Sequence, residues 1–300
     1  MVNINPSLFL SLFTNRVISL VFMLLVSLVA QAQEPKATYR QNDSIIGRLL
    51  DQDGSNHIAL YPYESNYIIH TYTSNINRKS IESYSWAEHA RKNETKFQIS
   101  LGFPIYRGIF GENSVLGAAY TQQSWWQSFN SSQSAPFRET NYQPQIFVGF
   151  LTDYQVLGLQ VKDIEFGFAH QSNGREKATS RSWNRLYART MATNGNFSLG
   201  LKLWYRIPED SADDDNPQIT RYLGYHELTL GYRLDKSQFT LKSRYNINSG
   251  YGSAELGWSY PLNDSIRIYA QLFSGYGESM IDYNYKQTRF GLGVMLNDLF

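Results

Sequence analysis

The chain has no cysteine, which excludes disulfide bridges and cysteine-ligated metals. Its charges nearly balance, at a formal +1, so the composition gives no reason to expect nucleic acid or a generally acidic partner. Long apolar runs are also missing after residue 30, so no transmembrane helix is expected in the mature chain.

The first 32 residues have the pattern of a secretory signal peptide. Arg16 precedes an almost wholly apolar run over 17–30, and residues 30–32 read Ala-Gln-Ala, the small-residue spacing that a signal peptidase recognises. The run is shorter than the roughly 20 residues that a membrane-spanning helix needs. We therefore predict cleavage after Ala32 and export of the remainder.

Aromatic residues are abundant, with 22 Tyr, 17 Phe and 6 Trp, although mean hydropathy is negative. Many aromatics, few apolar runs and a signal peptide together favour a bacterial outer-membrane β-barrel. A secreted β-sandwich is the alternative that composition alone leaves open.

Strict alternation of apolar and polar residues recurs along the chain, in segments 97–103, 197–205, 228–234, 254–260 and 266–272. Successive side chains of a strand point to opposite faces, so each segment has one apolar and one polar side. The last such segment, 290–296, is followed by a terminal Phe300, as is usual for the final strand of an outer-membrane barrel. We predict an all-β, antiparallel transmembrane barrel of about twelve strands over 67–300, preceded by a periplasmic segment over 33–66.

Three polar residues interrupt the apolar side of two neighbouring strands. The apolar parity of 164–168 continues through His170 and Ser172, and Asn184 continues that of the next strand, which begins near Ser182. A turn between the strands would bring the three side by side on the lipid-facing wall. Hydrophobic patterning gives no reason for polar residues there, so we interpret them as functional.

The chemistry of these residue types fits a serine hydrolase. Ser172 would be a nucleophile activated by the imidazole of His170, and Asn184 would orient that imidazole through its side-chain carbonyl. An asparagine also avoids burying a carboxylate against hydrocarbon. Gly174 leaves room for a backbone amide to approach an oxyanion. A His-x-Ser pair by itself is weak, and an ordinary polar loop remains the alternative; the shared parity of all three residues favours catalysis.

The run "HQSNGREKATSRSWNRLYARTMATNGN" (170–196) closely resembles the signature region of the outer membrane phospholipase A family. The segments "TQQSWWQS", "APFRETNY", "GYGESMIDYNY" and "VMLNDLF" resemble that family as well, and the likeness covers essentially the whole mature chain. The resemblance implies a twelve-stranded barrel and a calcium-dependent hydrolase that cleaves acyl esters of membrane phospholipids, with A1, A2 and lysophospholipase activity.

The resemblance also assigns roles. It makes Ser172 the nucleophile, His170 the general base and acid, and Asn184 the orienting residue, with the amides of Ser172 and Gly174 in the oxyanion pocket. It implies a Ca²⁺ ion held by oxygen atoms, as Ca²⁺ prefers. Its ligands would be the Ser180 hydroxyl, the Arg175 carbonyl and Ser134 of a second subunit. Lys177 departs from the family, since relatives can carry an acidic residue in this turn.

A homodimer is the further partner that the resemblance implies. Gln122 lies on the outward parity of its strand, and the family's glutamine at this position hydrogen-bonds across the dimer interface. Residence of Gln122 in the headgroup zone is the alternative. Activation by dimerisation would then control an outer-membrane enzyme whose active site faces the outer leaflet.

Two other functions compete with this one. A porin or structural barrel would have an open polar lumen and no role for His170. Charges of both signs on the inward parity fit a filled, hydrogen-bonded interior at least as well as a pore: Lys202, Arg233, Glu255 and Arg267. A catalytically degenerate relative that binds lipid or assists assembly is disfavoured, because all three triad positions are intact.

Overall fold

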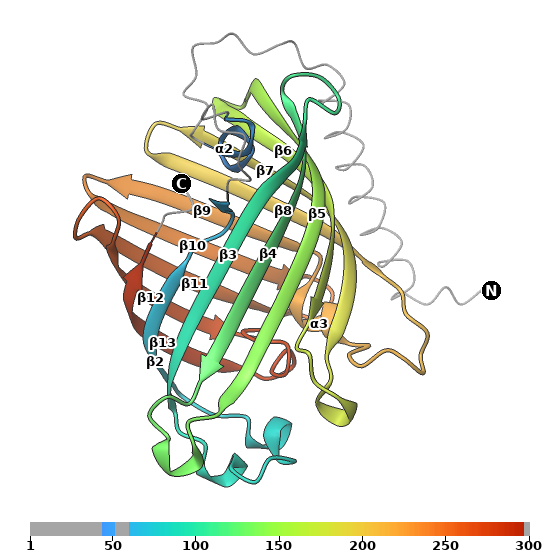
Figure 1. Cartoon of the computed structure of the whole chain (residues 1–300), viewed down its shortest axis with the longest axis vertical. Helices are drawn as coiled ribbons and strands as arrows, with labels where there is room; N and C mark the ends of the chain where they lie inside the picture. Colours follow the sequence, from blue (N-terminus) through green and yellow to red (C-terminus); the bar gives the residue numbers. More distant parts are fainter. Residues whose placement is uncertain (1–43, 52–59, 297–300) are drawn as a thin grey trace, which may run out of the picture.

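The computed structural model describes residues 44–51 and 60–296, and it shows a closed antiparallel barrel (Figure 1). Each of the strands β2 to β13 pairs with the next along the chain, and β13 pairs with β2 to close the ring. The predicted all-β barrel is thus confirmed. The predicted signal peptide and Phe300 lie outside the described residues. The barrel strands are β2 (Tyr67–Thr73), β3 (Asn93–Arg107), β4 (Ser114–Trp126), β5 (Phe137–Val156), β6 (Leu159–Ser172), β7 (Ser182–Asn194), β8 (Phe197–Ile207), β9 (His226–Leu234), β10 (Ser237–Asn246), β11 (Tyr251–Pro261), β12 (Arg267–Gly275) and β13 (Gln287–Met295).

Short elements occupy the connections and the N-terminal part. A two-residue strand, β1 (Tyr61–Pro62), pairs with the edge of β3 that β2 also occupies. The helices are α2 (Ile45–Leu50), α3 (Ile219–Leu223) and the single 3-10 turns η2 (Arg78–Ile81), η3 (Ala87–His89), η4 (Ser131–Gln133) and η5 (Lys177–Thr179). Within the described ranges, no helix is both long and apolar enough to cross a membrane.

The alternation in the sequence becomes the two sides of the wall. On β3, Ile99 is 47% exposed, whereas its neighbours Gln98 and Ser100 are buried in the interior. On β13, Phe290 and Leu292 point outward and Arg289 is buried. A closed ring with an apolar outer wall satisfies its backbone hydrogen bonds without water, as lipid requires.

The two ends of the barrel differ. Short turns join β3 to β4, β5 to β6 and β7 to β8 at one end, and longer loops join β2 to β3, β4 to β5, β6 to β7 and β8 to β9 at the other. Figure 1 shows α2 at the turn end and α3 at the loop end. The strand ends that carry His170, Ser172 and Asn184 all lie at the loop end.

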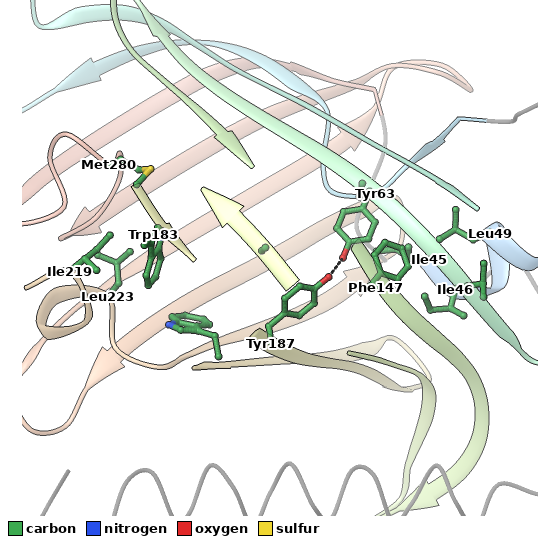
Figure 2. Close-up of a cluster of buried hydrophobic side chains, with 14 of the residues drawn as sticks. Ile45, Ile46, Leu49, Tyr63, Phe147, Trp183, Tyr187, Ile219, Leu223 and Met280 are labelled. Carbon is green, nitrogen blue, oxygen red and sulfur yellow. Dashed lines mark hydrogen bonds between the residues drawn. The ribbon is translucent and has the colours of Figure 1, made fainter. Parts of the chain in front are cut away.

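Helix α2 lies inside the turn end of the barrel. Ser44 caps it by accepting a hydrogen bond from the Gly47 amide at 3.0 Å. Its apolar face packs on Phe147 and on Gly149, where an added Cβ would lie 2.2 Å from the Ile46 side chain. Figure 2 shows Ile45, Ile46 and Leu49 beside Phe147 and Tyr63. This helix therefore fills the opening with apolar side chains; the predicted boundary of a periplasmic segment at 33–66 stays a prediction.

Ion pairs fill the interior toward the loop end. Arg138 contacts Glu94 at 2.6 Å and Asp282 at 2.5 Å, and Arg289 contacts Glu94 at 2.7 Å and Glu278 at 2.8 Å. All five side chains are buried. Farther along the axis, a polar cavity of about 150 Å³ remains, lined in part by residues 202 and 255. Paired charges thus occupy the interior toward the loop end, and Lys202 and Glu255, two of the charges predicted to face inward, line the cavity that remains.

Candidate active site

Strands β6 and β7 bring the three predicted catalytic residues together on the outer wall. His170 is directly opposite Asn184, and Ser172 is opposite Ser182. The His170 Nδ1 and Asn184 Oδ1 atoms are 2.9 Å apart, within hydrogen-bond distance. Ser172 follows two residues along the same face, and all three side chains are half-buried. Their catalytic roles stay a prediction; the structure shows that the three side chains lie on the same face of two paired strands.

The opposite face of the same strands confirms the direction in which these side chains point. Trp183 donates its indole N–H to the Gln171 side chain at 2.8 Å inside the barrel, and Arg185 donates to Gln143 there at 2.7 Å. On the outer side, Leu186 is 51% exposed. Because side chains alternate along a strand, His170 and Asn184 must face outward.

The turn that follows Ser172 is braced from within by Asn173. Its side chain donates to the Thr179 carbonyl at 2.9 Å and accepts from the Arg181 amide at 2.9 Å, which ties the two sides of the turn together. Gly174 has a φ of +61°, and an added Cβ would lie 3.1 Å from the Tyr142 ring. Both constraints favour glycine at the position predicted for the oxyanion pocket.

The predicted calcium residues lie in this turn and in one other loop. The Arg175 side chain donates to Glu139 at 3.0 Å and also bonds Tyr84 and the Arg138 carbonyl, so it anchors the turn. The Ser180 hydroxyl contacts the carboxylate of Asp215. Ser134 is exposed in the separate loop between β4 and β5, in a left-handed conformation with φ of 58°.

Oxygen atoms of this kind suit a hard cation. A serine hydroxyl beside a carboxylate offers oxygen atoms of the kind that Ca²⁺ prefers. Among the residues described, no group of three or more His, Cys, Asp or Glu side chains gathers as a metal site. A set with one carboxylate and several uncharged oxygens is compatible with that finding. The side chain of Lys177 lies outside the described part.

Loop 208–218 contributes two residues that sequence reasoning missed. Glu209 accepts a hydrogen bond from the Asn184 side-chain amide at 2.9 Å, and Asp215 contacts Ser180. The loop is held by Arg206, which contacts Asp214 at 2.6 Å, and by Asn216, which accepts from the Ser182 amide at 2.9 Å. Only its acidic composition set this loop apart in the sequence.

Gln122 lies on the outer wall of β4, as its parity predicts. Its side-chain oxygen accepts from the Tyr120 hydroxyl at 3.1 Å, and its amide donates to Ser124 at 3.2 Å. Within the described part of the chain, its second amide hydrogen has no acceptor, so it can serve a further partner.

Comparison with known proteins shows the family of this chain. The family model for phospholipase A1 matches residues 47–296. Phospholipase A1 of Klebsiella pneumoniae is 59% identical over 86% of this chain and 88% of its own length. The Escherichia coli K12 enzyme is 55% identical, over 93% and 96%.

Solved structures agree in fold. The outer membrane phospholipase of Salmonella typhi, crystallised as a dimer with bound calcium, is 56% identical, with a TM-score of 0.82, over 86% of this chain and 98% of that one. Outer membrane phospholipase A from Escherichia coli gives a TM-score of 0.83 at the same identity and coverage.

Fold and relatives together define a β-barrel hydrolase of the bacterial outer membrane. More specifically, the chain belongs to the phospholipase A1 family.

Proposed function

We propose that this barrel hydrolyses acyl esters of membrane phospholipids with Ser172 as nucleophile, His170 as general base and acid, and Asn184 as the residue that orients His170. The observation that carries the proposal is the 2.9 Å His170–Asn184 hydrogen bond on the lipid-facing wall, with Ser172 on the same face. A polar pair is costly against hydrocarbon and has no packing purpose there. An active-site mutant of the Escherichia coli relative, with an asparagine replaced by alanine, supports a functional asparagine in this family.

The reaction would follow the serine-hydrolase scheme. Ser172 Oγ attacks the acyl carbonyl while His170 Nε2 takes the hydroxyl proton. When the tetrahedral intermediate collapses, the ester C–O bond breaks and His170 returns the proton to the departing lysophospholipid oxygen. Water then attacks the acyl-enzyme with His170 again as base, which releases the fatty acid and restores Ser172. Amides of Ser172 and Gly174 would stabilise the oxyanion.

Calcium is the cofactor that we propose for this site. The Ser180 hydroxyl, the Arg175 carbonyl and Ser134 of a second subunit would hold it, and the Asp215 carboxylate stands next to Ser180 as an additional oxygen ligand. When bound, Ca²⁺ supplies positive charge close to the oxyanion pocket. The relative from Salmonella typhi contains calcium, which supports the assignment.

The active form that we propose is a homodimer. Ser134 is in a different loop from the Arg175–Ser180 turn, which fits a ligand contributed by the partner subunit. Gln122 keeps one amide hydrogen available on the outer wall, and a hydrogen bond across the interface would use it. The Salmonella typhi relative was crystallised as a dimer. Activity that needs two subunits would protect an intact membrane from the enzyme.

The decisive experiment measures fatty-acid release from phospholipid mixed micelles by the refolded protein, with calcium and with chelator. We expect calcium-dependent release that disappears in Ser172→Ala. The heat-dependent shift of the barrel in gel electrophoresis should show that this variant is still folded. Release that persists in folded Ser172→Ala would contradict the nucleophile assignment. Absence of release from the folded wild-type dimer, together with channel conductance in planar bilayers, would support a porin instead.

A further inference from the structure

A carboxylate stands behind the predicted triad. The Asn184 side chain lies between two partners: its Oδ1 is 2.9 Å from His170 Nδ1, and its Nδ2 donates to Glu209 Oε1 at 2.9 Å. Glu209 follows the end of β8, and its side chain is 18% exposed. A continuous hydrogen-bonded chain therefore runs from His170 through Asn184 to Glu209.

This carboxylate determines which way the asparagine amide points. An ionised carboxylate only accepts hydrogen bonds, so the Asn184 NH₂ group must face Glu209. The Asn184 oxygen is then left for His170, and because that oxygen also only accepts, His170 must carry its proton on Nδ1. The unprotonated Nε2 is thereby available to take the proton of Ser172. Without Glu209, nothing in these contacts distinguishes the two orientations of the amide.

Glu209 also supplies charge. Asn184 is neutral, so it offers less stabilisation to the imidazolium that forms during the reaction than a carboxylate would. Glu209 places a negative charge one hydrogen bond farther out and polarises the amide between them. In this position the charge stays near the polar loop and away from hydrocarbon, where it would be costly.

The loop holds Glu209 in place. Arg206 lies 3.8 Å from Glu209 and contacts Asp214 at 2.6 Å. Asn216 accepts from the Ser182 amide, two residues before Asn184. Ile207 is directly paired with Asn184 across β7 and β8. Strand register and loop contacts thus deliver the carboxylate to Asn184.

We infer that Glu209 is a positioning residue for the triad, acting on His170 through Asn184. The inference rests on the proposed function. Its consequence is that the orienting element of this enzyme is an asparagine–glutamate pair.

The test uses the full-length refolded protein with phospholipid mixed micelles at saturating calcium, and compares Glu209→Gln, Glu209→Ala, Asn184→Ala and the double variant Asn184→Ala with Glu209→Ala. A hydrogen bond to a charged group corresponds to roughly a tenfold change in rate. We expect Glu209→Ala to lower kcat about tenfold with KM nearly unchanged, and Glu209→Gln to lie between it and the wild type. Labelling of Ser172 by an alkyl sulfonyl fluoride should slow in parallel. Asp213→Asn, an exposed carboxylate of the same loop, is the matched control.

The double variant separates positioning from general loop damage. If Glu209 acts through Asn184, adding Glu209→Ala to Asn184→Ala changes nothing further. An equal additional loss in the Asn184→Ala background, or a wild-type kcat in Glu209→Ala, would overturn the inference. Failure of the proposed function itself has a different signature, because Ser172→Ala and Asn184→Ala would then keep full activity.

Discussion

Gln122 and Ser172 lie at the same level of the outer wall, separated by a single strand. Tyr142 on β5 is directly paired with both of them. Neighbouring strands are about 4.8 Å apart, so the two backbones are about 10 Å from each other. A second subunit that bonded Gln122 would therefore cover the surface beside the nucleophile and help to form an acyl-chain groove.

Gln122→Ala should weaken dimerisation. An interhelical or interstrand polar contact in a membrane contributes on the order of 1 kcal/mol, so the dimer dissociation constant should rise several-fold. Sedimentation equilibrium in detergent with calcium measures it. Ser274→Ala, on the outward face of β12, is the control. An unchanged dissociation constant would favour the headgroup-zone interpretation of Gln122.

Asp215→Asn should weaken calcium binding more than catalysis. The contact with Ser180 puts its charge beside the proposed ligands, and ligand charge is a main determinant of Ca²⁺ affinity. We expect the calcium concentration for half-maximal release to rise by about tenfold, with kcat at saturating calcium nearly unchanged. A titration that matches the wild type would mean that Asp215 only hydrogen-bonds Ser180. Asp213→Asn again controls for loss of one loop charge.

Glu278 should make the barrel acid-sensitive. It comes from the loop between β12 and β13. Burial raises the pKa of its carboxyl, but Arg289 and Lys96 outweigh that effect and lower the pKa from 4.5 to about 2. A lowered folded-state pKa stabilises the fold above pH 4.5, and this stabilisation is lost as the pH falls toward 2.

Glu278→Gln should therefore be roughly 3 kcal/mol less stable than the wild type at pH 7, because it removes a buried negative charge that pairs with Arg289 and Lys96. Near pH 2 the difference should almost vanish. Urea unfolding of the detergent-solubilised barrel at several pH values measures both. A deficit that is independent of pH would mean that the loss is one of packing and not of charge.

Ile46→Ala should loosen the turn end of the barrel. Ile46 is fully buried against Gly149 and Phe147. Removing a buried isoleucine side chain costs about 2–5 kcal/mol. Hydrogen exchange of residues 45–50 should accelerate, whereas activity at the distant loop end should hardly change. Protection equal to the wild type would show that α2 is held by its polar contacts, such as the 2.8 Å bond from Arg107 to the Leu49 carbonyl.

The sequence predicts the barrel wall and the direction of His170, Ser172 and Asn184 because alternation along a strand is a local signal. Once the apolar parity of 164–168 is known, the faces of His170 and Ser172 on the same strand follow. Antiparallel pairing of β6 with β7 then brings Asn184 opposite His170, as the register shows.

Glu209 and Asp215 were not predictable in the same way. They belong to loop 208–218, where no period tells which side chain points to which partner, and their contacts with Asn184 and Ser180 depend on tertiary structure. Helix α2 has only six residues, too few for a helical period to identify it. Its site inside the barrel depends on Gly149, about a hundred residues later.

The pairing of β2 with β13 constrains the order in which the barrel folds. The strands that close the ring are separated by more than 200 residues, since Arg289 lies opposite Thr73. Closure is therefore the most non-local step and must wait until the last strand is available. Helix α2 lies in the interior, so it has to be in place before β13 meets β2 or enter through an open end. Residues near the start of the barrel therefore need protection from aggregation until the later strands are available for pairing.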